Sequence, residues 1–404
     1  MQRIILIALF FCIYKPGFAQ LVNSGQAISV NSNGLLYIGG DFVNNEGTIL
    51  NKGTIIQKGN WTNDDATSFV FDEKSTGTVK FFGNDQLISG ISKTVFYDVA
   101  FSGTGQKILD SDIDVTRKLD LTDRELQVGD FIVSVSNPDA GAIIRTKGFI
   151  STGERGRLIR NTNSQASYLF PLGSSANGDL FYRPVMIEPG NALQNSFSVG
   201  LIYSDPALIG YDRESKRQDI QNISDKYFYL LSQTDGTANS NIKFYRNSNS
   251  DGNFSQLVSW NKFKLWEKAA PSTNADGDFG DGLNRALIFS SIETFRNLPI
   301  GFANLAATNS DFAPGPLTFF NAFSPDGDGK NDTWIIKNID LYPDNNLTIM
   351  NRWGDPVFKC KGYSGSKAWD GGSVLPGTYF YLLDVVINGK KQVYKGFITM
   401  VKKD

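Results

Sequence analysis

Histidine is absent from this chain of 404 residues. Its absence excludes hydrolases in which histidine activates a serine or cysteine nucleophile, and zinc sites with histidine ligands. Cysteine is nearly absent as well, since only Cys12 and Cys360 occur. Glycosidase chemistry needs only two carboxylates and is compatible with this composition, but no pair of acidic residues stands out. The sequence therefore favours a protein that is not an enzyme and leaves the question open.

A surplus of positive charge and long apolar runs are also missing. The formal net charge is −2, so we expect no nucleic-acid partner. Beyond the N-terminus no segment approaches eighteen apolar residues, so we expect no transmembrane helix in the mature chain.

The N-terminus has the pattern of a secretory signal peptide. Arg3 precedes an apolar run from Ile4 to Ile13, and Gly17 and Ala19 supply small residues before a cleavage point. Ten apolar residues are too few to span a bilayer. We predict a signal peptide over residues 1–19, and the bulky residues before Cys12 argue against a lipoprotein. After cleavage Cys360 is the only cysteine, so no internal disulfide can form in the oxidising compartments outside the cytoplasm.

Glycine and aromatic residues are abundant, and the apolar runs are short and separated by Asn, Asp, Ser and Gly. This composition predicts an all-β protein. In residues 20–157, similar runs such as Gly47-Thr48-Ile49 and Gly53-Thr54-Ile55 recur with turns between them. The rhythm predicts a β-solenoid, whose stacked coils bury one continuous core. The region also resembles exported bacterial surface proteins with coiled β repeats. Because the period is irregular, a β-sandwich stays open as the alternative.

Residues 158–304 contain longer and more aromatic strand candidates, including 197–203 and 227–231. Eight such candidates predict a β-sandwich or jelly roll. Trp260 and Trp266 are six residues apart, so one uninterrupted strand would place them on the same face. They offer a candidate aromatic platform for stacking on sugars, and two core or edge tryptophans are the alternative. Residues 305–316 are small, polar and rich in proline, which predicts a linker.

The last segment, residues 317–404, contains five short blocks in a fixed order. They are Asn321–Asp332, Leu347–Gly354, Lys367–Gly371, Leu375–Tyr381 and Tyr394–Thr399. This succession resembles the gliding motility-associated C-terminal domain, the type B sorting domain of type IX secretion substrates. The resemblance implies passage through the outer membrane by the type IX secretion machinery after Sec export through the periplasm. It places the protein at the outer cell surface or in the medium.

The same segment fits a seven-strand sandwich of immunoglobulin-like type. We expect Trp334, Trp353 and Trp369 in its core, where large rings stabilise a small domain without a disulfide. Asn388-Gly389 lies between two apolar runs and predicts a two-residue hairpin turn.

Two acidic loops are candidate calcium sites. Asp326, Asp328 and Asp332 alternate with glycines, which lets a chain fold around an ion that prefers oxygen ligands. The alternative is a turn whose side chains bond to their own backbone. Asp276, Asp278 and Asp281 form a second candidate with tighter spacing.

Two functions remain in view. The first is an exported structural or adhesion-type protein of the cell surface, which the C-terminal segment directs to type IX secretion. The second is a secreted carbohydrate-binding or carbohydrate-processing protein, suggested by Trp260, Trp266 and the carboxylates.

Overall fold

The computed structural model describes residues 20–401, except 68, 177, 179, 218, 270–271, 292–293, 306–316 and 388–389. The expected signal peptide and nearly all of the expected linker lie outside the described residues. The all-β class is confirmed, because the described helical segments are single turns. These are η1 Ala140–Ala142, η2 Pro206–Ile209, α1 Ser248–Asp251, η3 Ile339–Leu341 and η4 Gly365–Lys367. No helix in this part of the chain is long and apolar enough to cross a membrane.

The chain forms two compact units. The first holds residues up to Tyr211 together with 223–260 and 268–303. The second holds residues 304–404 with two short segments, 212–222 and 261–267.

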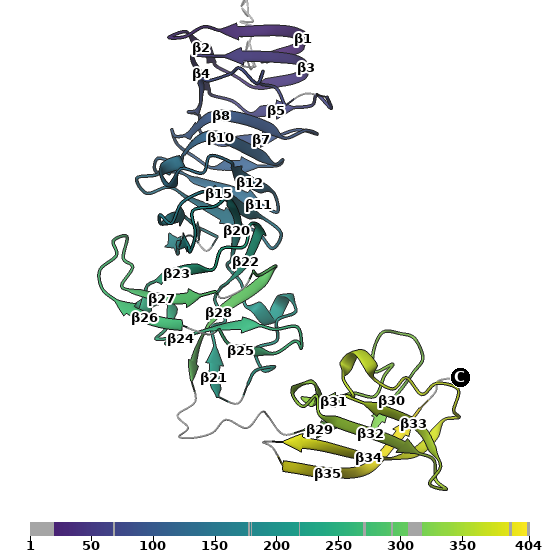
Figure 1. Ribbon diagram of the computed structural model, residues 1–404. Coiled ribbons are helices and arrows are strands. Elements are labelled where there is room, and N and C mark those ends of the chain that lie inside the picture. Colours follow the sequence, from purple (N-terminus) through teal and green to yellow (C-terminus); the bar gives the residue numbers. More distant parts are fainter. Residues whose placement is uncertain are drawn as a thin grey trace, which may run out of the picture. The chain divides into compact units, whose positions relative to one another are not determined.

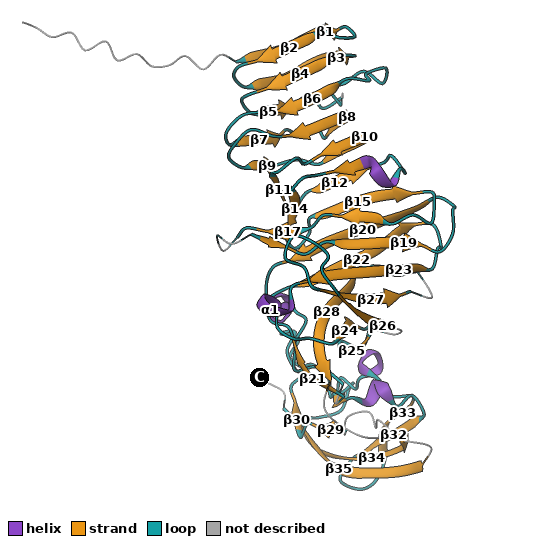
Figure 2. Ribbon diagram, turned by 90° about the vertical axis from the view of Figure 1, so that its left-hand side faces the viewer, coloured by secondary structure: helices purple, strands orange, loops and turns teal. Residues whose placement is uncertain are grey.

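The first unit begins with a β-solenoid, in which successive strands alternate between two parallel sheets (Figure 1). One sheet contains β1 Leu21–Val30, β3 Phe42–Asn51, β5 Trp61–Asn63, β7 Gln86–Ser89, β9 Lys107–Leu109, β11 Glu125–Gly129 and β14 Phe149–Thr152. The other sheet contains β2 Leu35–Ile38, β4 Thr54–Gln57, β6 Thr78–Phe81, β8 Thr94–Phe101, β10 Ile113–Asp120, β12 Ile132–Val135 and β15 Arg157–Thr162. Figure 2 shows the stack from the side. The predicted solenoid is therefore confirmed.

Equivalent apolar positions stack from coil to coil. Ile55 is in register with Val79, Val79 with Val99, and Val99 with Leu119. All four side chains are buried. Alternate side chains of each strand point into the solenoid, and the same inward positions recur in every coil. The stack therefore buries a continuous ladder of apolar side chains. The period in sequence is irregular because the turns between strands differ in length, as in the long connection between β5 and β6.

Buried amides and tight glycine turns fix the corners of the solenoid. The Asn23 side chain donates to that of Asn44, which donates to that of Asn63, at 3.1 and 3.3 Å. Such ladders satisfy buried polar groups from one layer to the next. At another corner, a Cβ added to Gly53 would lie 2.3 Å from the carbonyl oxygen of Gly34. The recurrent Gly-Thr pattern therefore marks turns that stack too closely for any side chain.

After β15 the strand direction changes from parallel to antiparallel. The same sheet continues through β20 Asn195–Ile202, β22 Phe228–Asp235, β28 Leu298–Leu305, β24 Gln256–Trp260 and β25 Trp266–Lys268. A second sheet contains β16 Tyr168–Phe170, β19 Val185–Pro189, β23 Ser240–Arg246, β27 Arg285–Ser290 and β26 Ser272–Asp276. The short strands β13 Ile143–Ile144, β17 Gly173–Ser174, β18 Phe181–Tyr182 and β21 Ile220–Ile223 complete this part. One hydrophobic core extends from Val30 to Phe302.

Thus β15 crosses the boundary expected at residues 157 and 158 without a break in the sheet or the core. The sandwich architecture expected for residues 158–304 stays a prediction.

Residues 317–401 form a separate small core with seven strands. Five belong to one sheet, in the order β30 Ala322–Phe323, β35 Lys390–Met400, β34 Gly377–Ile387, β32 Asn345–Met350 and β33 Pro356–Lys361. The other two are β29 Thr318–Phe319 and β31 Ile336–Lys337. Ile387 pairs with Lys390 at the ends of β34 and β35, and the predicted Asn388-Gly389 turn lies outside the described residues.

The tryptophans of this small core are only partly as expected. Trp334 and Trp369 are buried, which confirms two of the three predictions. The prediction for Trp353 is wrong, because its side chain is 74% exposed. Trp353 lies in the turn between β32 and β33, and the guanidinium of Arg352 is 4.7 Å from its ring centroid.

Candidate functional site

The first acidic loop brings its three carboxylates together. One oxygen from each of Asp326, Asp328 and Asp332 lies within 4.8 Å of the others. The Asp332 carboxylate accepts hydrogen bonds from the backbone N–H groups of Gly327 and Gly329, at 2.6 and 2.8 Å. Asp326 and Asp328 likewise accept from backbone N–H groups two residues ahead. The turn is therefore self-capped, and its exposed oxygens are of the kind that bind Ca²⁺.

The second acidic loop is arranged differently. Asp276 accepts from the Arg285 guanidinium at 2.6 Å, and this ion pair lowers the pKa of Asp276. Asp281 pairs with Arg145 at 2.9 Å, and Asp278 accepts from the backbone N–H of Gly280. Within the described ranges, the Asp326 turn is the only convergent acidic group. Calcium at the second loop stays a prediction, to which the geometry lends no support.

Trp260 and Trp266 do not form a platform. They belong to two strands, β24 and β25, separated by a turn in which Lys264 has a φ of 56°. Trp266 is fully buried, so it presents no face to a sugar. Trp260 packs edge-on against Tyr211, with ring centroids 5.7 Å apart. The expectation of one uninterrupted strand fails because the chain turns between the two residues.

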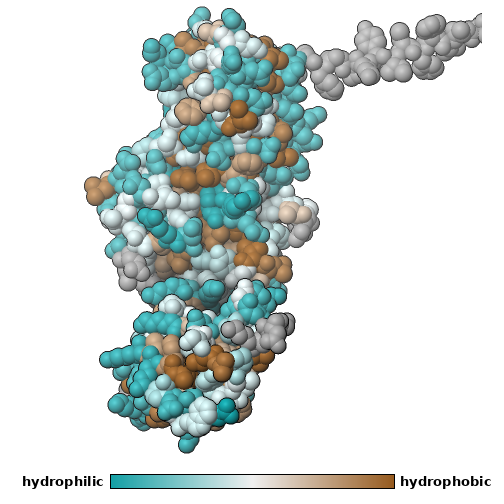
Figure 3. Space-filling view, turned by 90° about the vertical axis from the view of Figure 1, so that its right-hand side faces the viewer, coloured by the Kyte–Doolittle hydropathy of each residue, from teal (hydrophilic) through white to brown (hydrophobic). Residues whose placement is uncertain are grey.

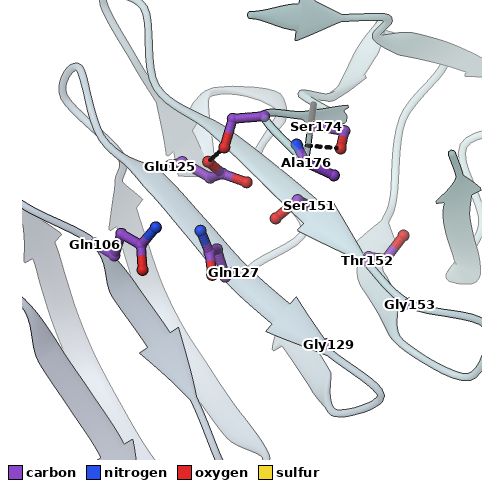
Figure 4. A pocket seen from close by; sticks show the side chains of 10 residues that line it. Gln106, Glu125, Gln127, Gly129, Ser151, Thr152, Gly153, Ser174 and Ala176 are labelled. Carbon is purple, nitrogen blue, oxygen red and sulfur yellow. Dashed lines mark hydrogen bonds between the residues drawn. The ribbon is translucent and has the colours of Figure 1, made fainter. Parts of the chain in front are cut away.

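A polar groove lies on the face of the solenoid sheet that contains β11 and β14 (Figure 4). It has a volume of about 350 Å³ and is lined by Gln106, Glu125, Gln127, Gly129, Ser151, Thr152, Gly153, Ser174, Ser175 and Ala176. Gln127 and Ser151 are in register on neighbouring strands. The Glu125 carboxylate accepts a hydrogen bond from the Ser175 hydroxyl. Amides and hydroxyls from successive coils thus line one recess, which suits a ligand rich in hydrogen-bonding groups.

A second recess, of about 260 Å³, is more aromatic. Its wall includes Tyr182, Tyr245 and Phe279, and the last two rings pack edge to face at 5.0 Å. The Arg145 guanidinium lies 4.1 Å from the centroid of Tyr182 and pairs with Asp281. Burial raises the pKa of Tyr182, so its hydroxyl stays protonated. Rings beside a few oriented polar groups are typical of small-ligand sites.

Neither recess could be predicted from the sequence. Gln127 and Tyr245 occupy outward positions of strands, and a single residue that points outward carries no signal of its own. Only the register of neighbouring strands brings such residues into one group. Phe279 could have been noticed, because a large ring between aspartates is unusual in a loop.

Among the described residues, the most deeply buried ion pair is structural. Arg183 and Asp251 are almost fully buried, and the Arg183 Nε donates to Asp251 at 2.6 Å. The Tyr227 hydroxyl also donates to Asp251, at 3.0 Å. Hydrogen bonds thus satisfy both charges, as burial requires. The network anchors the turn at α1 and has no free group directed at solvent.

The C-terminal segment matches a known family model. Residues 317–400 match the family of the CHU_C type IX secretion signal domain. The matched signal domain covers the small seven-strand core and about a fifth of the chain. It supports an exported protein, sorted by type IX secretion to the cell surface or the medium, and implies contact with that machinery. Comparisons with curated proteins and with solved structures returned no match.

Proposed function

We propose that this protein is a structural or adhesion-type component of the cell surface, which the signal domain delivers through the type IX pathway. Residues 1–19 act as a Sec signal peptide, and the solenoid with its antiparallel extension is the displayed cargo. The match of residues 317–400 to the signal domain carries the export part of this proposal.

The polar groove supports the adhesive role. Each coil adds a strand to the same face, so weak polar contacts accumulate along an extended ligand. The groove combines side chains from β11 and β14 with Gln106, which directly precedes β9. A ligand that is itself repetitive and rich in hydrogen-bonding groups, such as a polysaccharide or an extended protein segment, fits this geometry.

The aromatic recess supports glycan binding as the second candidate function. Tyr245 and Phe279 supply apolar ring surface, and the pair Arg145–Asp281 supplies hydrogen-bonding groups at its rim. A pyranose has matching apolar and hydroxyl faces. This candidate places the sugar site away from Trp260 and Trp266.

Binding of the mature chain to a glycan array and to a panel of matrix proteins separates the two roles. If the groove is adhesive, the double variant Gln106→Ala, Gln127→Ala loses binding at least tenfold, whereas Gln26→Ala, an exposed glutamine outside the groove, binds normally. If the recess holds a sugar, Phe279→Ser abolishes glycan binding and Phe263→Ser, outside the recess, does not. Retention of all binding by both groove and recess variants would contradict both assignments.

A further inference from the structure

The signal domain exposes an apolar face on its five-stranded sheet. One side of β34 packs into the core through Tyr379, Tyr381 and Leu383. The opposite side carries Phe380 and Leu382, which are 45% and 37% exposed. This alternation is regular, so the outward aromatic residue belongs to a defined face of the sheet.

The neighbouring strand extends this face. Phe397 is directly opposite Phe380, and Val393 is opposite Asp384. Phe397 and Val393 are 50% and 62% exposed. The paired phenyl rings and the two aliphatic side chains therefore lie on the two adjoining strands β34 and β35. We call this set, Phe380, Leu382, Val393 and Phe397, the outer apolar face.

A solvated face of an antiparallel sheet is normally polar. Monomeric proteins rarely leave contiguous apolar patches of this kind uncovered, and such patches mark interaction sites. In the space-filling view, apolar side chains also gather on one side of the C-terminal part of the chain (Figure 3). The alternation that buries the inner residues does not require phenylalanine at outward positions, so core packing does not account for this face.

The surroundings of the outer apolar face are basic. Lys395 is opposite Leu382, and Lys391 is opposite Val386 on the same side of the sheet. Lys359 lies on the same side, across Thr348 on β32. Asp384 is the acidic residue among these outward positions of β34 and β35. A partner with an apolar centre and acidic rim residues would complement this surface.

We propose that the outer apolar face is the surface by which the type IX secretion machinery binds this domain. The inference rests on the proposed export of the chain. The matched family is a secretion signal domain, and the secretion machinery must bind some surface of such a domain. The machinery contributes an apolar contact to Phe380 and Phe397 and carboxylates to the lysines around them.

The test compares full-length chains expressed in a host with a type IX pathway, by the fraction reaching the surface and medium. The double variant Phe380→Thr, Phe397→Thr keeps strand-forming residues at outward positions, so it folds and is exported at least tenfold less. The variant Phe380→Leu, Phe397→Leu retains the apolar contact and is exported within twofold of the wild type. Ile335→Thr removes an apolar side chain that is 47% exposed and lies outside this set, and leaves export unchanged.

Charge provides an independent arm. Lys359→Glu combined with Lys395→Glu reduces export, whereas Lys80→Glu in the solenoid has no effect. Retention of the wild-type chain in the periplasm would overturn the proposed export. Binding to the purified outer-membrane machinery is therefore also measured in solution, which tests the outer apolar face independently of export. Export and binding of a folded Phe380→Thr, Phe397→Thr variant at wild-type levels would overturn the inference. So would a wild-type dimer that this variant converts to a monomer, because the face would then join two copies.

Discussion

At the scale of single residues, Lys107 shows how the solenoid satisfies its turns. Its ammonium donates to the carbonyl oxygens of Gly83, Asn84 and Thr104, at 2.6 to 2.9 Å. One coil earlier, the Gln86 amide donates to the carbonyls of Gln57 and Gly59. The side chain at this corner therefore donates the hydrogen bonds that water would otherwise give to the turn carbonyls. An apolar residue would leave these buried carbonyls without donors.

Lys107 should make stability depend on pH. Burial, helped by the charge of Arg124, lowers the pKa of Lys107 from 10.5 to about 8. The unfolded chain therefore binds more protons than the folded chain between pH 8 and 10.5, and the contribution of Lys107 to stability rises with pH in that window. Relative to Lys107→Gln, which cannot titrate, the wild type should gain about 1–3 kcal/mol of unfolding free energy between pH 7.5 and 10. Denaturant unfolding of both proteins measures this, and a constant difference would show that the pKa is unshifted.

Trp353 and Trp369 make a second comparison between residues. Both are tryptophans of the same small domain, so residue type does not explain why one is exposed and the other is buried. The difference comes from Asn351, whose side-chain oxygen accepts from the backbone N–H groups of Trp353 and Asp355. This local turn holds Trp353 outside the core. The pattern Asn-Arg-Trp-Gly-Asp therefore indicates an exposed turn, in which the tryptophan does not belong to the core.

We expect Trp353→Ser to change the unfolding free energy of the signal domain by less than about 0.5 kcal/mol. Trp369→Ala should cost about 3–5 kcal/mol, because it removes a buried ring that packs on Phe323 and Tyr379. Chemical denaturation, followed by fluorescence of the remaining tryptophans, measures both. Equal losses would mean that Trp353 is buried in solution.

At the scale of elements, glycine and apolar patterns were sufficient to predict the solenoid but not its details. Gly53 and Gly77 mark stacked turns, and the Thr-Ile and Thr-Val pairs after them enter strands of one sheet. The register between coils depends on turn lengths, which no single strand encodes. For the same reason the polar groove could not be predicted, since it consists of outward residues from different coils.

The acidic turn is the element for which we expect a ligand response. If Asp326, Asp328 and Asp332 hold Ca²⁺, calcium at a hundred times its dissociation constant should stabilise the folded C-terminal domain by about 2.7 kcal/mol and so raise the melting temperature of its transition. Asp328→Ala should remove most of this shift, because it removes one of the three carboxylates. It should disturb the turn little, because the Asp328 carboxylate caps only one backbone N–H. Asp332→Ala is a poorer probe, since it also frees two N–H groups of the turn.

Asp278→Ala, in the second acidic loop, serves as the matched control and should leave the calcium shift intact. Melting curves with calcium and with chelator decide the matter. Identical midpoints for the wild type in both conditions would leave only the self-capped turn.

At the scale of the whole molecule, the chain combines two kinds of stability. The cargo has one extended core, built coil upon coil, and the signal domain has a small core closed by its last strand. That strand, β35, pairs with β34 along its full length and with β30 on its other side. We therefore expect export to depend on the pairing of this strand.

Deletion of residues 391–404 tests this dependence. The truncation removes nearly all of β35, separates β30 from β34 and leaves β34 as a long apolar edge, so we expect the signal domain to unfold. The solenoid has its own core and should still fold, and the chain should accumulate in the periplasm. Protease accessibility on intact cells should then fall at least tenfold relative to the full-length protein.

In the converse experiment, residues 307–404 placed behind a signal peptide and a fluorescent reporter should bring that reporter to the surface or the medium. Equal surface exposure of the full-length and truncated chains would contradict the role of this domain. Export without the pairing of β34 and β35 would mean that the folded sheet is not needed for sorting.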